Sequence, residues 1–290
     1  MKLVSHSGSF HLDDLFAVAT INILYPNLEI VRSRKQEDFD SADFVVDVGD
    51  IYDQEKNRFD HHQHGGAGTR ENGVPYAAFG LVWKKFGPLV SGEARVADLV
   101  DKKMVQPIDA ADNGYNMYRE TKKGLSPYLL DNAFKALTPT WRDKETVDDT
   151  FKRLLPLAQE ILIREIKKAK YFFEDTELVK KAYKETEDKR IIVLEHPMAW
   201  KSVISRKKEP LFLIHPNQIT GEWIVACVRK NPRSHENRKL FPQAWGGKRG
   251  EALEKATGVK GSESCHNKRF ICTAWTKEAA MELAKLAVKA

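Results

Sequence analysis

The sequence has few cysteines and no long hydrophobic run. Its 290 residues include only three cysteines, Cys227, Cys265 and Cys272, and none of them form a C-x-x-C pair. This small odd number argues against both a disulfide framework and a structural zinc knuckle. No run of about 18 or more apolar residues occurs, which excludes a membrane-spanning helix. We therefore expect reduced thiols and no membrane partner.

The start of the chain has no secretory signal. Polar residues interrupt the apolar ones from His6 onward, whereas a signal peptide needs a continuous apolar core. A strand expected at residues 3–5 also leaves no room for a transit peptide. These absences predict a cytoplasmic protein.

The formal net charge of +6 hides an asymmetry along the chain. Residues 1–150 carry 18 basic and 24 acidic side chains, a net charge of −6. Residues 201–290 carry 18 basic and 8 acidic side chains, a net charge of +10. An acidic region paired with a basic one suits a protein that binds divalent cations and a phosphate-rich substrate.

The N-terminal half alternates short β-type runs with helical patterns. Strands are expected at residues 3–5, 28–32 and 43–48. Helices are expected at residues 13–24, 76–86 and 93–105, the last two ending at Gly87-Pro88 and Pro107. This alternation predicts an α/β fold with a mostly parallel sheet and flanking helices.

The C-terminal part has a different pattern. A charged helical stretch runs from residue 147 to about 173, and residues 174–189 read as a linker or a solvated helix end. Strands are expected at 190–195, 211–215, 223–229 and 270–275, and a helix at 276–290 with Thr276 as its N-cap. We therefore predict a catalytic domain over residues 1–187, including a helical connector at about 147–187, and a smaller α+β domain over residues 188–290.

Four segments rich in histidine and aspartate lie in the N-terminal half, at residues 6–14, 43–49, 58–66 and 108–114. Ligand sites in α/β sheets gather at the carboxyl ends of strands. Imidazole and carboxylate groups together suit Mn²⁺, Mg²⁺, Zn²⁺ or Fe²⁺, and these segments hold more ligands than one ion can take. Two ions about 3.5–4 Å apart are a general solution for in-line attack on phosphorus.

The order of these motifs carries a resemblance. H-x-G-x-F-H-x-D is followed by D-V-G, R-F-D-H-H-Q and I-D-A-x-D-N-G. This order resembles the melanocyte-proliferating-gene family of DHH-type phosphoesterases, distant relatives of RecJ-type exonucleases and manganese-dependent pyrophosphatases. The likeness extends over nearly the whole chain, including residues 241–250, 257–261 and 265–266.

The resemblance implies two divalent metal ions, with Mn²⁺ favoured over Mg²⁺, and a DHH-type catalytic domain. One ion would be surrounded by His6, His11 and Asp47, and the other by Asp13, Asp47, His61 and an aspartate of the fourth motif. That aspartate is Asp109 or Asp112, and Asp112 is favoured because it precedes Asn113-Gly114. The resemblance also implies that Asp60 orients the neighbouring histidines and that His62 faces the substrate.

The basic C-terminal region supplies candidates for substrate binding. Five basic pairs come from separate segments of it, and nucleic-acid backbones carry the matching charge. We interpret Trp223 and Trp275 as core residues and Trp245, in a polar glycine-rich loop, as a substrate contact. The candidate substrate-binding residues are Arg238, Trp245, Lys248, Arg249, His266 and Arg269.

These observations predict a metal-dependent phosphodiester hydrolase. The resemblance implies that it degrades RNA or short oligonucleotides from the 3′ end, while single-stranded DNA remains open. One alternative is a hydrolase of small nucleotides or phosphoanhydrides. Another is a non-catalytic nucleic-acid-binding protein with a structural metal site. The sequence also leaves a homodimer open.

Overall fold

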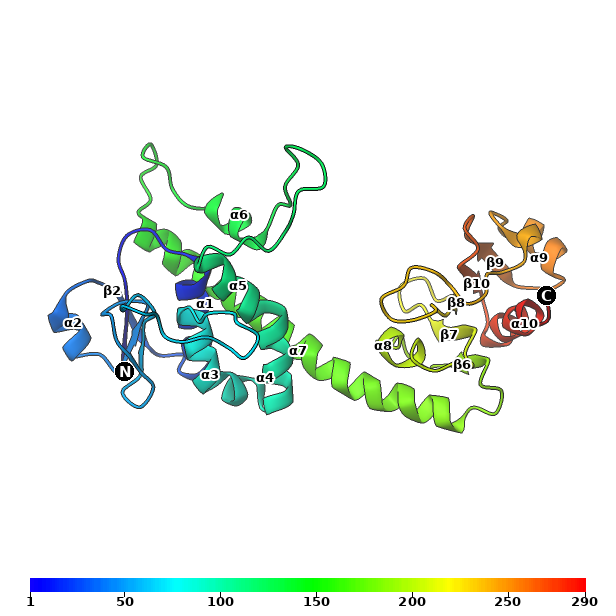
Figure 1. Ribbon diagram of the computed structural model, residues 1–290. Helices are drawn as coiled ribbons and strands as arrows, with labels where there is room; N and C mark the ends of the chain where they lie inside the picture. Colours follow the sequence, from blue (N-terminus) through cyan, green and yellow to red (C-terminus); the bar gives the residue numbers. More distant parts are fainter. The chain divides into compact units, whose positions relative to one another are not determined.

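The computed structural model describes residues 1–290 and divides into two compact units, Met1–Lys170 and Tyr171–Ala290. Helix α7 (Val147–Glu185) runs across this division, so the helical pattern extends twelve residues beyond its expected end at 173. The expected domain boundary at 187/188 lies just after this helix and stays a prediction. Figure 1 shows the elements of both units.

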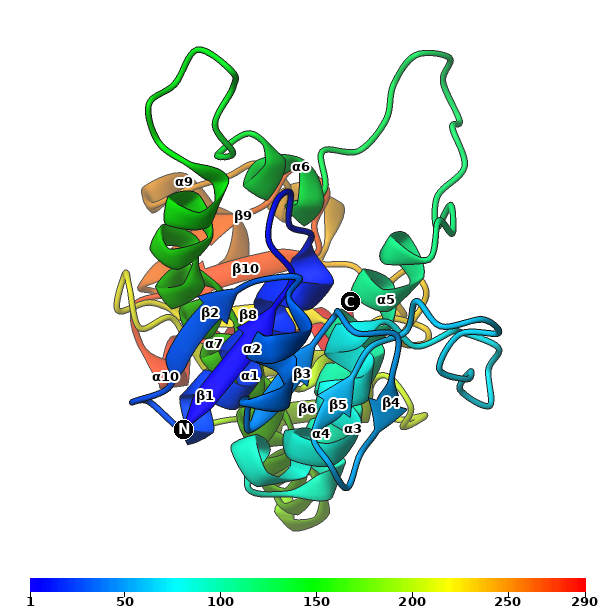
Figure 2. The same cartoon turned by 90° about the vertical axis from the view of Figure 1, so that its left-hand side faces the viewer.

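A five-stranded sheet forms the centre of the first unit. Its order is β2 (Glu29–Arg32), β1 (Lys2–Ser5), β3 (Phe44–Val46), β5 (Arg58–Phe59) and β4 (Tyr52–Asp53). All neighbours are parallel except β4, which pairs antiparallel with β5 at the edge. Figure 2 shows the strands side by side in this order. The prediction of an α/β fold with a mostly parallel sheet is confirmed.

Helices cover both faces of this sheet. Helix α1 (Leu12–Leu24) packs on α3 (Ala78–Ser91), and both contact the strands on one face. On the other face, Phe39 of α2 (Gln36–Asp40) packs with Val4 and Val45. Alternation along the strands sends Leu3 and Phe44 to the opposite side from these valines. The sheet is thus buried on both faces, as its continuous apolar runs predict.

Two expected helix ends are wrong. Helix α3 continues through Pro88 to Ser91. Helix α4 (Ala94–Val100) continues into a π-helical turn η1 (Asp101–Val105) and then into α5 (Gln106–Asp112). Pro107 lies directly after the π-helical turn, where the change in hydrogen-bond pattern already interrupts the i→i−4 ladder. The helix therefore reaches the fourth motif, and a short α6 (Leu130–Lys135) follows it.

The second unit has a five-stranded sheet of its own, and its α+β character is confirmed. Its order is β6 (Ile191–Val193), β7 (Phe212–Pro216), β8 (Trp223–Cys227), β10 (Ile271–Ala274) and β9 (Ser262–Cys265). Only β6 and β7 pair in parallel, and the other pairs are antiparallel. Its short helical elements are α8 (Lys201–Ile204), the 3₁₀-helix η2 (Gln243–Trp245) and α9 (Glu251–Thr257).

The last helix, α10 (Lys277–Lys289), contacts β7, β8, β9 and β10. The Thr276 side chain accepts a hydrogen bond of 3.1 Å from the N–H of Ala279, so the expected N-cap is confirmed. The core beneath this helix includes Phe212, Phe241 and Leu283. None of the helices in either unit combines the length and apolar composition that crossing a bilayer requires.

Candidate metal centre

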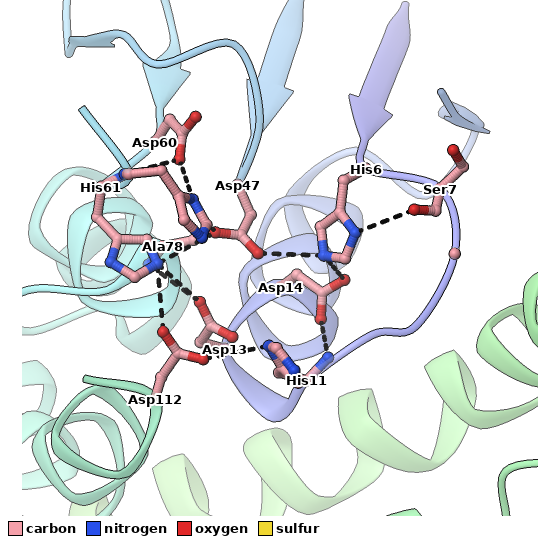
Figure 3. Close-up of polar contacts among 12 residues, drawn as sticks. His6, Ser7, His11, Asp13, Asp14, Asp47, Asp60, His61, Ala78 and Asp112 are labelled. Carbon is pink, nitrogen blue, oxygen red and sulfur yellow. Dashed lines mark hydrogen bonds and ion pairs between the residues drawn. The ribbon is translucent and has the colours of Figure 1, made fainter. Parts of the chain in front are cut away.

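The strand register brings the first two motifs together. Ser5 of β1 pairs with Val46 of β3, so the residues that follow, His6 and Asp47, leave the sheet side by side. The His6 Nε2 atom lies 3.3 Å from Asp47 Oδ2 (Figure 3). Both side chains are buried. The parallel pairing of β1 and β3 therefore brings these two side chains into contact.

The backbone at Asp47 has a left-handed conformation, with φ of 58°. Aspartate adopts this region more readily than most residues. The N–H of Asp47 donates a hydrogen bond of 3.0 Å to the carbonyl oxygen of Phe59, which holds the turn against β5. The carboxylate is thereby placed between two histidines: Oδ2 faces His6, and Oδ1 lies 3.3 Å from His61 Nε2. The two oxygens of Asp47 therefore contact different histidines.

The first turn of α1 adds two buried carboxylates. Asp14 accepts a hydrogen bond of 2.9 Å from the N–H of His11, and its other oxygen lies 3.2 Å from His6 Nε2. Asp13 accepts a hydrogen bond of 3.3 Å from Ala78, at the N-terminus of α3, and lies 3.8 Å from His61 Nε2. The N-termini of both helices thus point toward the cluster, which favours negative charge there.

Asp112, at the end of α5, closes the cluster. It lies 3.2 Å from His61 Nε2 and 3.3 Å from His11 Nδ1. The structure therefore groups His11 with Asp13 and Asp112, not with His6 and Asp47 as expected. Asp14 takes that place beside His6. Sequence reasoning did not include Asp14 among the candidate ligands, although it lies in the first histidine- and aspartate-rich segment.

Asp60 holds the two adjacent histidines of the third motif. One of its oxygens accepts hydrogen bonds from the His61 N–H at 2.7 Å and lies 2.7 Å from His62 Nδ1. The other accepts a hydrogen bond of 2.6 Å from the Asp50 N–H. His62 itself is exposed at the edge of the cluster. These contacts agree with an orienting role for Asp60, which stays a prediction.

Asp109 lies outside the cluster. Its carboxylate forms a buried ion pair of 2.8 Å with Arg70 and accepts a hydrogen bond of 2.9 Å from the Gly80 N–H. Burial raises the pKa of Asp109 to about 7, and Arg70 opposes that rise. Of the two aspartates considered from the sequence, Asp112 is therefore the one that faces the histidines.

The pKa values of the histidines show whether the charge of the cluster suits metal ions. Burial lowers the pKa of His6, but hydrogen bonds and charge from Asp14 and Asp47 outweigh it and raise that pKa to about 10. Burial likewise lowers the pKa of His61, and its aspartate partners again raise it to about 10. Both imidazoles therefore lie in a strongly negative field.

Beyond these close imidazole–carboxylate contacts, several buried atoms of the cluster make no hydrogen bond of good geometry, which is costly in the absence of a bound cation. They are Asp13 Oδ1, Asp14 Oδ2, Asp47 Oδ1 and His61 Nε2. A site for divalent metal ions has these features: an excess of carboxylate charge, oxygen and nitrogen atoms that are free to bind a metal, and a mixture of the two ligand types. The cluster fits such ions.

In the second unit, three of the six substrate candidates have structural contacts instead. Trp245, the expected substrate contact, is only 5% exposed and packs on Phe241, so it is a core residue. Trp275, expected in the core, is 54% exposed. Trp245 is the last residue of η2, a 3₁₀ turn that sequence reading took for a polar loop, and its side chain belongs to the core of the second unit.

Arg238 donates hydrogen bonds to the carbonyl oxygens of Ser205, Lys208 and Pro210. Arg269 has a left-handed backbone and donates to the carbonyl oxygen of Phe241. These two guanidinium groups hold loops together. The remaining candidates, Lys248, Arg249 and His266, are partly or fully exposed.

Comparisons with known proteins give the family of the chain. The model of the MYG1_exonuc family, described as "Uncharacterised protein family (UPF0160)", matches residues 2–288. The chain belongs to the MYG1 family. It is 31% identical to the "MYG1 exonuclease" of Mus musculus over 98% of this chain and 84% of the mouse protein. It is also 31% identical to a MYG1 protein of Saccharomyces cerevisiae over 99% and 95% of the two chains. No solved structure is significantly similar to it.

Membership of the MYG1 family confirms the resemblance found in the motifs. The structure adds one residue near the cluster that sequence reasoning missed. The exposed Arg34 follows β2, and its Nη2 atom lies 3.2 Å from His6 Nδ1 while its Nε donates to the Ser7 carbonyl oxygen. A basic residue just after an expected strand was the available signal, since such positions border the site.

Proposed function

We propose that this chain is a metal-dependent exonuclease that removes nucleotides from the 3′ end of RNA or short oligonucleotides. The observation that supports it best is the cluster in which one buried carboxylate, Asp47, contacts both His6 and His61. The names of the mammalian relatives give the reaction class. The RNA preference, the polarity and the use of two ions are our inference from the DHH-type motifs.

Two divalent ions fit this arrangement. His6, Asp14 and Asp47 would hold one, while His11, Asp13, Asp112 and His61 would surround the other, with Asp47 shared. Bound divalent ions would supply charge that offsets the phosphate and lower the pKa of a water toward about 7. We take Mn²⁺ as the better fit and Mg²⁺ as the alternative, because imidazole nitrogens favour Mn²⁺ over Mg²⁺.

The protein residues around the cluster would position the phosphodiester and move a proton. Asp60 accepts a hydrogen bond from the Nδ1–H of His62, which leaves Nε2 of that exposed ring available to substrate. In its imidazolium form, His62 can donate the Nε2 proton to a leaving oxygen. Arg34, beside His6, offers a guanidinium fork to a phosphate.

The test is incubation of end-labelled RNA and DNA oligomers with Mn²⁺ or Mg²⁺. We expect stepwise shortening of RNA by the wild type and loss of cleavage in Asp47→Ala and His61→Ala. His64→Ala is the matched control, because this exposed histidine belongs to the same loop and makes no contact with the cluster. Intact oligomers under every metal condition would disprove the nuclease proposal. Turnover that does not depend on oligomer length would favour a hydrolase of small nucleotides.

A further inference from the structure

A cavity adjoins the cluster of histidines and aspartates. Its volume is about 360 Å³, and His11, Asp13 and Asp112 form part of its wall. A second part of the wall consists of Met104, on the π-helical turn, and of Pro107 and Ile108, on α5. A third part comes from the segment that follows α5. The cavity thus combines apolar side chains with the candidate metal ligands in one wall.

The part of the wall that follows α5 consists of apolar side chains that are exposed to solvent. Met117 is 48% exposed, Leu129 is 38% exposed and Leu130 is 37% exposed. Large apolar side chains scattered singly on a surface need no explanation, but three that converge on one cavity mark a binding site. They favour a ligand with an apolar body that lies against them.

The polar groups of the cavity add a second requirement. Lys103 and Lys135 lie on its rim, and Lys135 pairs with Asp131 at 2.7 Å. The far end is the cluster, which fits divalent cations. A ligand for this cavity therefore combines an apolar body with a negatively charged group. A volume of about 360 Å³ falls within the range of small-molecule pockets and suits one nucleotide, not the end of a duplex.

We propose that this cavity holds the nucleoside of the terminal nucleotide, with its base against Met117, Leu129 and Leu130 and its 5′-phosphate directed to the cluster. This inference rests on the proposed exonuclease function. Base contacts with apolar and aromatic surfaces tolerate different sequences, because every base has a flat apolar face. The cavity therefore selects for a base without selecting which base.

The first test measures binding without turnover. AMP and ribose 5-phosphate are titrated into the full-length protein in the same Mn²⁺ buffer. We expect AMP to bind about tenfold more tightly than ribose 5-phosphate, and Leu129→Ser to remove most of that difference. Leu129 is the N-cap of α6, where serine is a favoured residue, so we expect this variant to keep the fold.

Two further variants complete the design. Met117→Ser should act like Leu129→Ser, because both side chains line the cavity. Leu125→Ser is the control, since Leu125 is 65% exposed in the same segment but does not line the cavity. Equal affinity of the wild type for AMP and ribose 5-phosphate would overturn the proposal, as would equal losses in Leu125→Ser and Leu129→Ser.

The second test separates this inference from the proposed function. Wild type and Leu129→Ser are compared on RNA oligomers whose 3′-terminal nucleotide either carries a base or lacks one. We expect the missing base to lower kcat/KM about tenfold for the wild type and to have little effect on the variant. If the wild type cleaves both oligomers equally, the cavity proposal fails and the exonuclease stands. If it cleaves neither, the proposed function itself fails.

Discussion

Asp109 and Arg70 form a buried ion pair of 2.8 Å directly over Gly80. A Cβ atom at Gly80 would lie 1.9 Å from Asp109 Oδ2 and 2.6 Å from Arg70 Nη2. The N–H of Gly80 also donates to the same aspartate. Helix α3 can therefore approach α5 closely only because residue 80 has no side chain, and Asp112 lies one turn further along α5.

The first prediction concerns this close approach. Gly80→Ala should lower the free energy of unfolding by about 1–3 kcal/mol, because the added methyl group must displace a buried ion pair. Urea unfolding measures the change. Leu89→Ala, on the same helix and 65% exposed, should stay within about 0.5 kcal/mol of the wild type. Equal effects of the two substitutions would contradict this account.

A second prediction follows from the pKa of Asp109, which burial raises from its usual 3.8 to about 7. Between these values the folded protein keeps a proton that the unfolded chain has lost. The contribution of Asp109 to stability therefore falls as the pH rises from about 4 to about 7. Asp109→Asn removes this dependence, so its stability should decline less than that of the wild type between pH 5 and pH 8. Urea unfolding at the two pH values measures this, and an equal decline in the unfolding free energy of the wild type and Asp109→Asn would refute it.

The third prediction concerns metal addition. Mn²⁺ at about one hundred times its dissociation constant should stabilise the protein by about 2.7 kcal/mol, which corresponds to a rise in Tm of about 5–10 °C. Asp47→Asn should lose this rise, because it removes the shared carboxylate while asparagine tolerates the left-handed backbone. Glu71→Gln, an exposed change outside the cluster, should keep the full rise. An undiminished shift in Asp47→Asn would show that the metal binds elsewhere.

A fourth prediction concerns the protons that a metal displaces. With pKa values of about 10 in the metal-free site, His6 and His61 are protonated at pH 7. Ligation needs neutral imidazole, so Mn²⁺ binding should release protons and weaken as the pH falls, by about tenfold per pH unit for each proton released. Calorimetry in buffers of different ionisation enthalpy counts these protons. His6→Gln should release fewer protons than the wild type. A binding heat that is the same in every buffer would contradict this prediction.

The fifth prediction compares two arginines of the second unit. Arg238→Ala should lower stability by about 1–3 kcal/mol, because three carbonyl oxygens lose their donor. Arg249→Ala should leave stability unchanged, since this side chain is exposed, and should reduce the salt dependence of RNA binding by about one unit of slope. Unfolding curves and salt-dependent binding assays separate the two roles. A stability loss in Arg249→Ala as large as that in Arg238→Ala would contradict the assignment.

Sequence patterns predicted the elements that local chemistry determines. The apolar runs at β1 and β3 and the N-cap at Thr276 are read from adjacent residues, and parallel pairing then places His6 beside Asp47. Strands β4 and β5 were not predicted, because two residues each are too short to show a period.

Other features depend on contacts between distant segments. The partners of Asp109 and Asp112 are settled by Arg70 and His61, which lie about 40 or more residues earlier in the chain. The sequence shows that Arg238 and Arg269 are positively charged, but not that their guanidinium groups donate hydrogen bonds to backbone carbonyl oxygens. Composition cannot distinguish an arginine that binds phosphate from one that holds a loop, because both need the same donors.

The π-helical turn at Asp101–Val105 has an evolutionary consequence. Such a turn holds one residue more than an α-helix of the same length, and each residue of a helix turns the next by about 100°. Deleting one residue from this turn would therefore return it to an α-helix of the same length and leave Asp112 facing His61. The same deletion in the α-helical part between this turn and Asp112 would instead rotate Asp112 by about 100°, so the turn is the place where this helix tolerates a change in length.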